Sequence, residues 1–370
     1  MDPIVTDNGS DNADTLTGGN NNDDLRSGKS DDIINAGGGD DNLDGGPDND
    51  TLNGGPDNDT LRGGTGSDVS NGGTGDDIFV YSPGDVGENE HIGDYEFGEW
   101  INIGVLGPLG PPHNGLPTDS QVRMRPEPGG TALDLDLDGD GAFDVTIHLD
   151  GVRGGKAVLQ PQGGVRIYEE RNGTAANDLI PADGAAFFAD GGGGFDTLNL
   201  NVNFGSVDIT HGSGQYFIDG QVFGHIALEG IELVTFEDGG LRLDIDGNAG
   251  QAFRLYQAAF GRIPDTEGLT YWIHELDAGR GDATWMALSF IESEEFIERY
   301  GTSESVNNFE FLSLLYANIL DRDPDSGGFA YWEAELERGF ARESALASFS
   351  ESVENKQLTE ISTEEGIWIL

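Results

Sequence analysis

The sequence predicts a multidomain fold of β plus α type. It comprises an N-terminal parallel β-roll, a β-rich middle with a second short roll, and a C-terminal all-α bundle. Three observations support this prediction: a nine-residue repeat near the N-terminus, short apolar segments bounded by glycine in the middle, and a helical period of 3.6 residues in the last third. We place the predicted domains at residues 1–82, 83–171, 172–243 and 244–356, followed by a tail at 357–370.

The composition excludes several classes of protein. Acidic residues number 69 against 18 basic ones, a formal net charge of −51. Nucleic acid is excluded as a main partner, because phosphate binding needs clustered Lys and Arg. The chain has no cysteine, hence no disulfide or zinc-thiolate framework. No stretch approaches the roughly 18 apolar residues of a membrane span. The expected partners are cations.

Residues 9–80 form eight rows of nine residues that share one pattern. The sixth place of every row is Asp, and the eighth place is apolar in all rows but the one with Ser70. Most rows begin with two glycines, and the fourth place holds Gly, Asn, Asp or Ser, most of which tolerate a left-handed backbone. The aligned acids are Asp14, Asp23, Asp32, Asp41, Asp50, Asp59, Asp68 and Asp77.

This pattern predicts a glycine-rich turn of six residues and then a three-residue strand with one inward apolar side chain. Two rows form a coil, and coils stack by parallel pairing about 4.8 Å apart, so the turns of rows i and i+2 face each other. Facing turns present carboxylates and backbone carbonyls, the hard oxygen ligands that Ca²⁺ prefers. Without a cation, neighbouring carboxylates repel by ~3 kcal/mol at an effective dielectric near 20. The eight rows form six facing pairs, from Asp14–Asp32 to Asp59–Asp77, so up to six calcium ions are expected.

The nonapeptide G-G-x-G-x-D-x-U-x, with U apolar, resembles the calcium-binding repeat of RTX (repeats-in-toxin) proteins. The resemblance covers residues 9–80 and implies a calcium-binding parallel β-roll. The segment 94–103 looks like the strand region that follows the roll in serralysin-type RTX proteins. The sequence departs from the repeat at Ser27, Ala36, Asp48, Asp57 and Ser70.

An acidic loop in the middle of the chain predicts a further calcium site. Its carboxylates occupy places 1, 3, 5 and 9 of an EF-hand-type loop, with Gly141 at place 6. Place 12 is Ile147 rather than Glu, and the flanking segments alternate like strands. We therefore expect a β-hairpin loop that holds one calcium ion, and the alternative is a solvated acidic turn. The acids are Asp136, Asp138, Asp140 and Asp144.

A second, shorter roll is predicted at residues 173–199. The row 191–199 matches the nonapeptide completely, and the two rows before it place Ile180 and Ala189 in the apolar column. Because rows i and i+2 share a side, Asp178 faces Asp196, and one calcium ion is expected between them. Strands are also expected at residues 132–137, 143–149, 165–168, 215–218 and 231–236.

The helical third of the chain duplicates itself. Residues 256–279 align without gaps on residues 316–339. Each unit is predicted as a helix, a Pro-Asp turn with Asp as N-cap, and a second helix, which together form a bundle of four to six helices. The helical spacing predicts core packing for the two tryptophans, and the alternative is a sugar-binding platform. The aligned residues include Asp265 with Asp325, Tyr271 with Tyr331, and Trp272 with Trp332.

Residues 244–356 resemble a bacterial helical domain of unknown function that often trails RTX repeats and is distantly similar to phycobilisome linker domains. The resemblance rests on the motif Pro-Asp-x-x-Gly-x-x-Tyr-Trp and implies no activity. Asp244, Asp246 and Asn248 precede the first helix, where they are candidates for an N-terminal cap or for a cation site.

The two ends of the chain bear on its localisation. The first residues contain neither a basic segment nor an apolar core, so no Sec-type signal peptide is expected. The last seven residues place acids before an apolar end, which looks like the uncleaved type I secretion signal of RTX proteins; the alternative is a frayed tail. The resemblance therefore implies a secreted bacterial protein, extracellular or attached to the cell surface, that passes through type I secretion machinery.

No catalytic constellation emerges from the sequence. The six histidines are scattered without an H-E-x-x-H motif, and no G-x-S-x-G motif occurs. The sequence favours a secreted calcium-binding structural or interaction protein of the surface-layer, adhesin or matrix-associated type, and not an enzyme. Its helical domain is expected to bind cell-surface or matrix polysaccharide, or a second copy of the chain. The alternative is an extracellular polysaccharide- or protein-processing enzyme, or its non-catalytic RTX carrier module.

Overall fold

The computed structural model separates into two compact units. The first unit comprises Met1–Asn172, Asp183–Asp190 and Asp208–Glu229, and the second comprises Gly173–Ala182, Gly191–Val207 and Gly230–Leu370. The structure describes residues 5–82, 90–103, 122–135, 145–159, 164–182, 186–212, 215–302, 305–320, 325–363 and 365–370.

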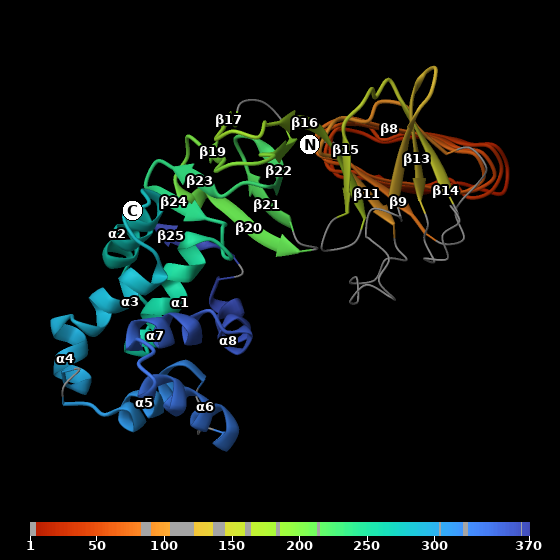
Figure 1. Ribbon diagram of the computed structural model, residues 1–370. Helices are drawn as coiled ribbons and strands as arrows, with labels where there is room; N and C mark the ends of the chain where they lie inside the picture. Colours follow the sequence, from red (N-terminus) through yellow and green to blue (C-terminus); the bar gives the residue numbers. More distant parts are fainter. Residues whose placement is uncertain are drawn as a thin grey trace. The chain divides into compact units, whose positions relative to one another are not determined.

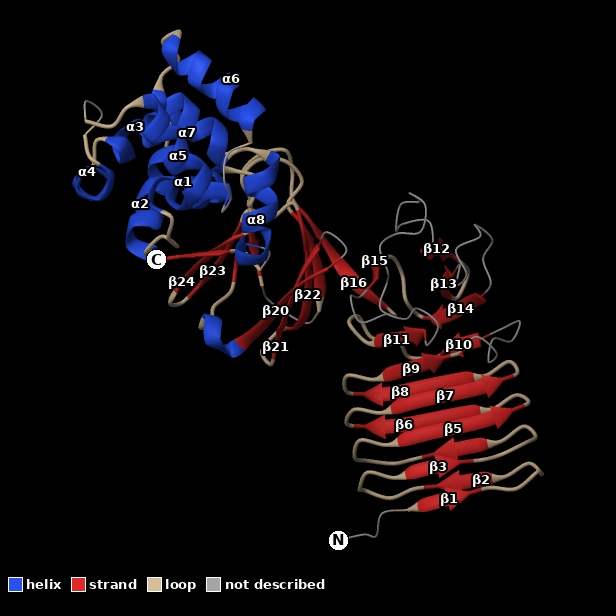
Figure 2. Cartoon of the chain, turned by 90° about the horizontal axis from the view of Figure 1, so that it is seen from below, coloured by secondary structure: helices blue, strands red, loops and turns tan. Residues whose placement is uncertain are grey.

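The nonapeptide rows form a parallel β-roll in the first unit (Figure 2). Successive strands alternate between two sheets, and each strand pairs with the strand two rows away, as in Leu25 with Leu43 and Leu16 with Ile34. The predicted pairing of rows i and i+2 is confirmed. One sheet contains β1 (Thr6–Asn8), β3 (Asp24–Arg26), β5 (Asn42–Pro47), β7 (Thr60–Thr65) and β9 (Ile78–Tyr81). The other contains β2 (Thr15–Thr17), β4 (Ile33–Asn35), β6 (Thr51–Pro56) and β8 (Val69–Thr74).

The interior of the roll follows the predicted apolar column. Leu25, Ile34 and Leu43 are fully buried, and Ser70 is buried in the same column. From the third row on, the fourth place adopts a positive φ even without glycine, as at Asp48 (φ 82°). The strands β5 to β8 span six residues rather than the predicted three, because the glycine pair that follows each short strand also pairs across coils.

Both sheets of the first unit continue beyond the nonapeptide rows. β11 pairs in parallel with β9, and β10 with β8, so the stacking extends past the last row. Four of the five predicted middle strands fall on β13, β14, β16 and β21, and the fifth, predicted at residues 231–236, falls on β23 (Leu233–Phe236) of the second unit. The continuing strands are β10 (Glu90–Ile92), β11 (Trp100–Ile103), β12 (Val122–Pro126), β13 (Gly130–Leu135), β14 (Val145–Asp150), β15 (Lys156–Leu159), β16 (Val165–Asn172), β18 (Phe187–Asp190), β20 (Val207–Gly212), β21 (Gln215–Gly220) and β22 (Gly224–Glu229).

The second unit contains a separate sheet in the order β17-β19-β23-β24-β25. Its last strand is formed by the end of the chain, which pairs antiparallel with β24 (Figure 1). The ring of Trp368 lies 4.6 Å from that of Phe204 and 5.8 Å from that of Phe236, between ring centroids. The last residues thus form an edge strand and not a frayed tail. The strands are β17 (Leu179–Pro181), β19 (Thr197–Asn199), β23 (Leu233–Phe236), β24 (Gly239–Arg242) and β25 (Ile367–Ile369).

The described residues of the second unit also form eight α-helices, more than the four to six predicted. The difference arises because two short helices, instead of one, follow each Tyr-Trp motif. The duplication is confirmed, since the bounds of α5 and α6 lie 60 residues beyond those of α1 and α2. Within the described ranges, no helix is both long and apolar enough to cross a membrane. The helices are α1 (Asn248–Phe260), α2 (Thr266–Asp277), α3 (Ala283–Ile291), α4 (Glu294–Tyr300), α5 (Asn308–Leu320), α6 (Ser326–Glu337), α7 (Arg342–Ser350) and α8 (Val353–Thr363).

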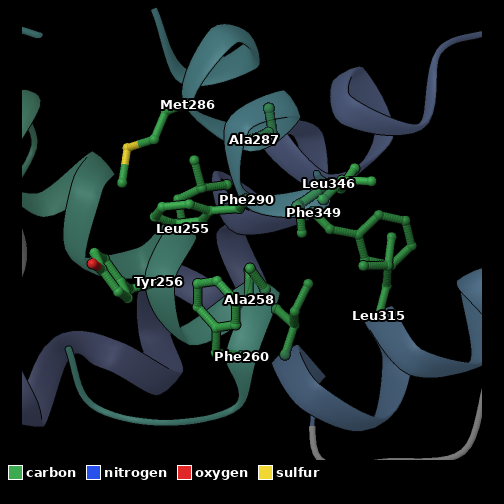
Figure 3. Close-up of a cluster of buried hydrophobic side chains, with 14 of the residues drawn as sticks. Leu255, Tyr256, Ala258, Phe260, Met286, Ala287, Phe290, Leu315, Leu346 and Phe349 are labelled. Carbon is green, nitrogen blue, oxygen red and sulfur yellow. The ribbon is translucent and has the colours of Figure 1, made fainter. Parts of the chain in front are cut away.

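Aromatic side chains of the two repeats form the helical core, part of which is drawn in Figure 3. Trp272 packs on Phe290 with ring centroids 5.2 Å apart, and Trp332 packs on Phe349 at 5.1 Å. Both tryptophans are partly buried against this core, in agreement with the predicted packing role. Each repeat also has the predicted cap: the side chain of Asp265 accepts a hydrogen bond from the N–H of Gly268, and Asp325 accepts one from Gly328.

Candidate metal centre

The aligned Asp residues of the N-terminal roll form two hydrogen-bonded columns, one from the odd rows (Asp14, Asp32, Asp50 and Asp68) and one from the even rows (Asp23, Asp41, Asp59 and Asp77). In each step the backbone N–H of one Asp donates to Oδ1 of the Asp one coil further along the chain, as from Asp41 to Asp59 at 2.7 Å. The turn places each of these side chains directly over the backbone of the preceding coil, so the 18-residue register lines up the carboxylates of alternate rows in two separate columns. The other steps are Asp14 to Asp32, Asp23 to Asp41, Asp32 to Asp50, Asp50 to Asp68 and Asp59 to Asp77, at 2.7–2.9 Å.

The second carboxylate oxygen of the column Asp residues is the candidate cation ligand. At five positions in the interior of the roll, Oδ2 is buried and has no hydrogen-bond partner. A buried oxygen of this kind costs ~1–3 kcal/mol, and more if it is charged, unless a ligand or a proton compensates it. The residues concerned include Asp32, Asp41, Asp50, Asp59 and Asp77.

Glycine leaves open the space in front of Oδ2 in the last four rows, those of Asp50, Asp59, Asp68 and Asp77, whereas Ser27 and Ala36 take this place in the rows of Asp32 and Asp41. A Cβ atom on Gly54 would lie 2.2 Å from Asp59 Oδ2 and 2.6 Å from the carbonyl oxygen of Gly72. A carboxylate and a carbonyl from consecutive coils therefore converge where a side chain is missing. The described residues, those of the roll included, contain no group of three or more His, Asp or Glu side chains placed to hold a metal ion, so backbone carbonyls must complete any oxygen shell here. This donor set fits Ca²⁺, which accepts carbonyl and carboxylate oxygens in flexible geometry.

Burial and repulsion disfavour the ionised column. Burial, with weaker contributions from neighbouring Asp charges, raises the pKa of Asp50 and of Asp59 to about 7. The same causes raise the pKa values of Asp41 and Asp77. A divalent cation beside these groups would reverse the effect, because an opposite charge favours the ionised carboxylate.

The first acid of each column differs from the interior ones. Asp14 Oδ2 accepts hydrogen bonds from the N–H and hydroxyl of Ser10, and these bonds lower its pKa. Asp23 Oδ2 accepts from the N–H of Gly19. These oxygens already have partners in the chain, so the first coil offers a weaker site than the interior coils.

The column continues through glutamates that the nonapeptide pattern does not reveal. The register of β9 with β11 places Glu99 beside Asp77, and that of β8 with β10 places Glu90 beside Asp68. Each glutamate follows its neighbouring Asp by 22 residues rather than 18, so the two acids do not align when the sequence is written in rows of nine. Glu99 is buried, its Oε1 has no hydrogen-bond partner, and burial raises its pKa to about 9.

A side chain from the following coil closes this end of the roll. The carboxylate of Asp94 accepts hydrogen bonds from the N–H groups of Gly72 and Gly73, at 2.9 and 3.0 Å. In an interior coil, the N–H of the second glycine of a row donates instead to the carbonyl of the first glycine one coil further along the chain, as from Gly37 to Gly54. Asp94 thus satisfies the last turn without a further nonapeptide.

The calcium ligands predicted outside the N-terminal roll lie in three different parts of the chain. Asp178 and Asp196 are brought together, with the N–H of Asp178 donating to Asp196 Oδ1 at 2.8 Å. Asp244 forms an ion pair with Arg242 and accepts a hydrogen bond from the N–H of Ala249 at 3.3 Å, so its role at the start of α1 is structural. The predicted acids Asp136, Asp138, Asp140 and Asp144 lie outside the described residues.

Comparison with protein-family models assigns both ends of the chain. The RTX calcium-binding nonapeptide repeat (4 copies) matches residues 8–43 and again residues 44–79. A domain of unknown function, DUF4214, matches residues 252–300 and 287–359. No curated protein matches the chain.

Proposed function

We propose that this chain, which carries RTX calcium-binding repeats at its N-terminus and a DUF4214 domain at its C-terminus, is an extracellular structural or interaction protein whose roll folds on calcium. RTX repeats bind calcium as a family property. Calcium-dependent folding of the roll outside the cell goes beyond that property. The observation that carries it is the set of buried, unpartnered Oδ2 atoms along the two Asp columns.

The energetics of the roll support calcium-dependent folding. The interior of each row contributes one apolar side chain per nine residues, whereas backbone ordering costs ~1–2 kcal/mol per residue. Bound calcium would supply the positive charge that offsets the repulsion between stacked carboxylates. The free energy of ion binding therefore becomes folding free energy, as in other small metal-dependent domains.

The helical domain is proposed as the interaction module. It has an ordinary aromatic core with no need of a cation, and its two repeats expose equivalent tyrosines, Tyr271 and Tyr331, at 54% and 60%. Each tyrosine stacks edge-on against the tryptophan that follows it. Two equivalent aromatic surfaces suit a repetitive partner, such as a cell-surface or matrix polysaccharide or a second copy of the chain.

Secretion by a type I system is part of the proposal. Extracellular calcium modules commonly bind at ~10⁻⁴–10⁻³ M, well above cytosolic calcium. The roll would remain extended inside the cell and fold once it meets millimolar calcium outside. Expression in a bacterium with a type I exporter, with and without residues 357–370, tests this step, and export that persists without these residues would contradict it.

A calcium titration of the full chain tests the proposed function directly. Circular dichroism should show a cooperative gain of β-structure at submillimolar to millimolar calcium. A glycan array and a sedimentation experiment on the calcium-loaded chain then distinguish polysaccharide binding from self-association. The alternative, an extracellular enzyme or its carrier module, predicts turnover in a protease or polysaccharide-lyase assay of the same sample.

A further inference from the structure

We propose a calcium site in the second unit between Asp196 and Glu232, a pairing that the nonapeptide spacing does not predict. The site is separate from the N-terminal roll and has its own residues and its own test. It rests on the proposed calcium-binding function only in the identity of the cation.

The strand register places Glu232 in the position of a column acid. β19 pairs in parallel with β23 so that Thr197 lies opposite Leu233, and Glu232 therefore lies beside Asp196 despite a separation of 36 residues. The N–H of Asp196 donates to Glu232 Oε2 at 2.7 Å. This bond reproduces the step between successive column acids in the N-terminal roll, with Glu in place of Asp.

A shortened turn supplies the carbonyl oxygen. A Cβ atom on Gly191 would lie 2.6 Å from Asp196 Oδ2 and 2.1 Å from the carbonyl oxygen of Gly230. The same test on Gly45 in the N-terminal roll meets Asp50 Oδ2 at 2.5 Å and the carbonyl oxygen of Gly63 at 2.6 Å. Gly230 thus has the position that the first glycine of the next row has in the N-terminal roll. In a nonapeptide row four residues lie between this glycine and the acid, as between Gly63 and Asp68, whereas only one lies between Gly230 and Glu232.

The buried oxygen of Asp196 indicates a ligand at this position. Asp196 is fully buried, and its Oδ2 has no hydrogen-bond partner. In the described part of the chain, neither Asp196 nor Glu232 forms an ion pair with a base. The nearby guanidinium of Arg242 is held by Asp244 at 2.8 Å and by Asp277 at 2.7 Å. Two adjacent carboxylates without a counter-charge favour a divalent cation.

Solvent reaches the Glu232 side of the site, whereas Asp196 is buried. An open groove of about 510 Å³ is lined by Glu232 together with Asp244, Asp246 and Asp277. The donors of the site are carboxylate and carbonyl oxygens, with no nitrogen or sulfur ligand among them. Such a set selects Ca²⁺ over transition metals.

Native mass spectrometry of the calcium-loaded full chain tests the site by counting bound ions. Glu232→Gln keeps an amide oxygen that accepts from the N–H of Asp196 but removes the charge, so it should bind one ion fewer than the wild-type chain. The matched control is Glu237→Gln, a change of the same chemistry at an exposed residue that follows the same strand. The control should keep the wild-type count. A wild-type count in Glu232→Gln overturns the site while leaving the N-terminal columns intact.

Crystals of the wild-type chain grown in calcium provide a test that does not depend on a variant. An anomalous peak about 2.3–2.6 Å from Asp196 Oδ2, and within the same range of Glu232, supports the site. A peak in the N-terminal roll without one here overturns this inference alone. A wild-type chain that binds no calcium in either experiment overturns the proposed function as well.

Discussion

The backbone N–H of Asp59 donates to Oδ1 of Asp77, one coil along the roll, at 2.8 Å, while Asp77 Oδ2 is buried without a hydrogen-bond partner. The same carboxylate thus has one oxygen fixed by the preceding coil and one directed at the open space over a glycine. In the interior of the roll, one oxygen of such a carboxylate holds the coils in register, and the other is the candidate calcium ligand.

Removal of calcium should unfold the roll and spare the helices. The column carboxylates repel once the cation is withdrawn, whereas the helical core is apolar and aromatic. In excess chelator, far-ultraviolet circular dichroism should lose most of its β-signal and keep its helical signal. Limited proteolysis should cleave residues 1–82 before residues 250–356. A roll that stays folded and protease-resistant in chelator would refute calcium-dependent folding.

Acid should partly replace calcium. Asp50 and Asp59 have a folded pKa of about 7 against an ordinary value of 3.8. Ionisation of such a buried carboxyl destabilises the fold; this penalty is absent below the ordinary pKa, grows between the two values and is complete above the folded one. The calcium-free chain should therefore gain β-signal as the pH falls from about 8 to about 5. Over the same range the calcium midpoint should rise, because protons compete for the carboxylates, and a midpoint independent of pH would contradict the assignment.

The variant Asp59→Asn should behave oppositely with and without calcium. It removes a charge shared by two facing pairs, so the calcium midpoint should rise at least about tenfold, or roughly 1.4 kcal/mol. In chelator above about pH 7.5 the same variant should be more ordered than the wild type, since its buried amide carries no charge. Asp57→Asn is the control, because Asp57 is exposed and its φ of 80° suits Asn. Equal midpoints for the two variants would argue against a ligand role for Asp59.

Gly54→Ala should block a calcium site sterically. The new methyl group would approach Asp59 Oδ2 to 2.2 Å and the carbonyl oxygen of Gly72 to 2.6 Å, the two oxygens proposed to bind the cation. Gly38→Ala is the matched control in the same roll, since its methyl group would meet nothing closer than Pro56 Cγ at 3.5 Å. Isothermal titration should show fewer bound ions for Gly54→Ala only, and the control should be neutral or up to ~1 kcal/mol more stable.

The two Pro-Asp turns should contribute equally to the helical domain. Asp265→Ala and Asp325→Ala each remove an N-cap, at an expected cost of ~0.5–2 kcal/mol, and their effects should add. Asp246→Ala, at a side chain that is 89% exposed, should cost less than 0.5 kcal/mol. Urea unfolding followed by the helical signal measures all three. The losses should be the same in calcium and in chelator, and a calcium-dependent loss would contradict an independent helical core.

The parts of the structure that follow a fixed period were predictable from the sequence. The nine-residue spacing assigns the facing pairs of the roll, and the 60-residue duplication assigns the helical repeats. The column acids Glu90, Glu99 and Glu232 escaped prediction, because insertions or a shortened turn shift them from the period and only strand register reveals them. Local sequence also gave no signal for the contacts of Arg242, whose partner Asp277 is 35 residues away.

Because Asp94 closes one end of the roll, we expect the coils to fold in order from that end. Each coil contacts only the coils before and after it, so the roll behaves as a one-dimensional array in which order spreads between nearest neighbours. The coil that adjoins Asp94 is fixed by chain contacts, whereas among the described strands β1 and β2 of the first coil each pair on one side only. Folding should therefore begin at the coil next to Asp94 and proceed coil by coil toward the N-terminus. Rows deleted from the N-terminal end should therefore shorten the array without unravelling what remains.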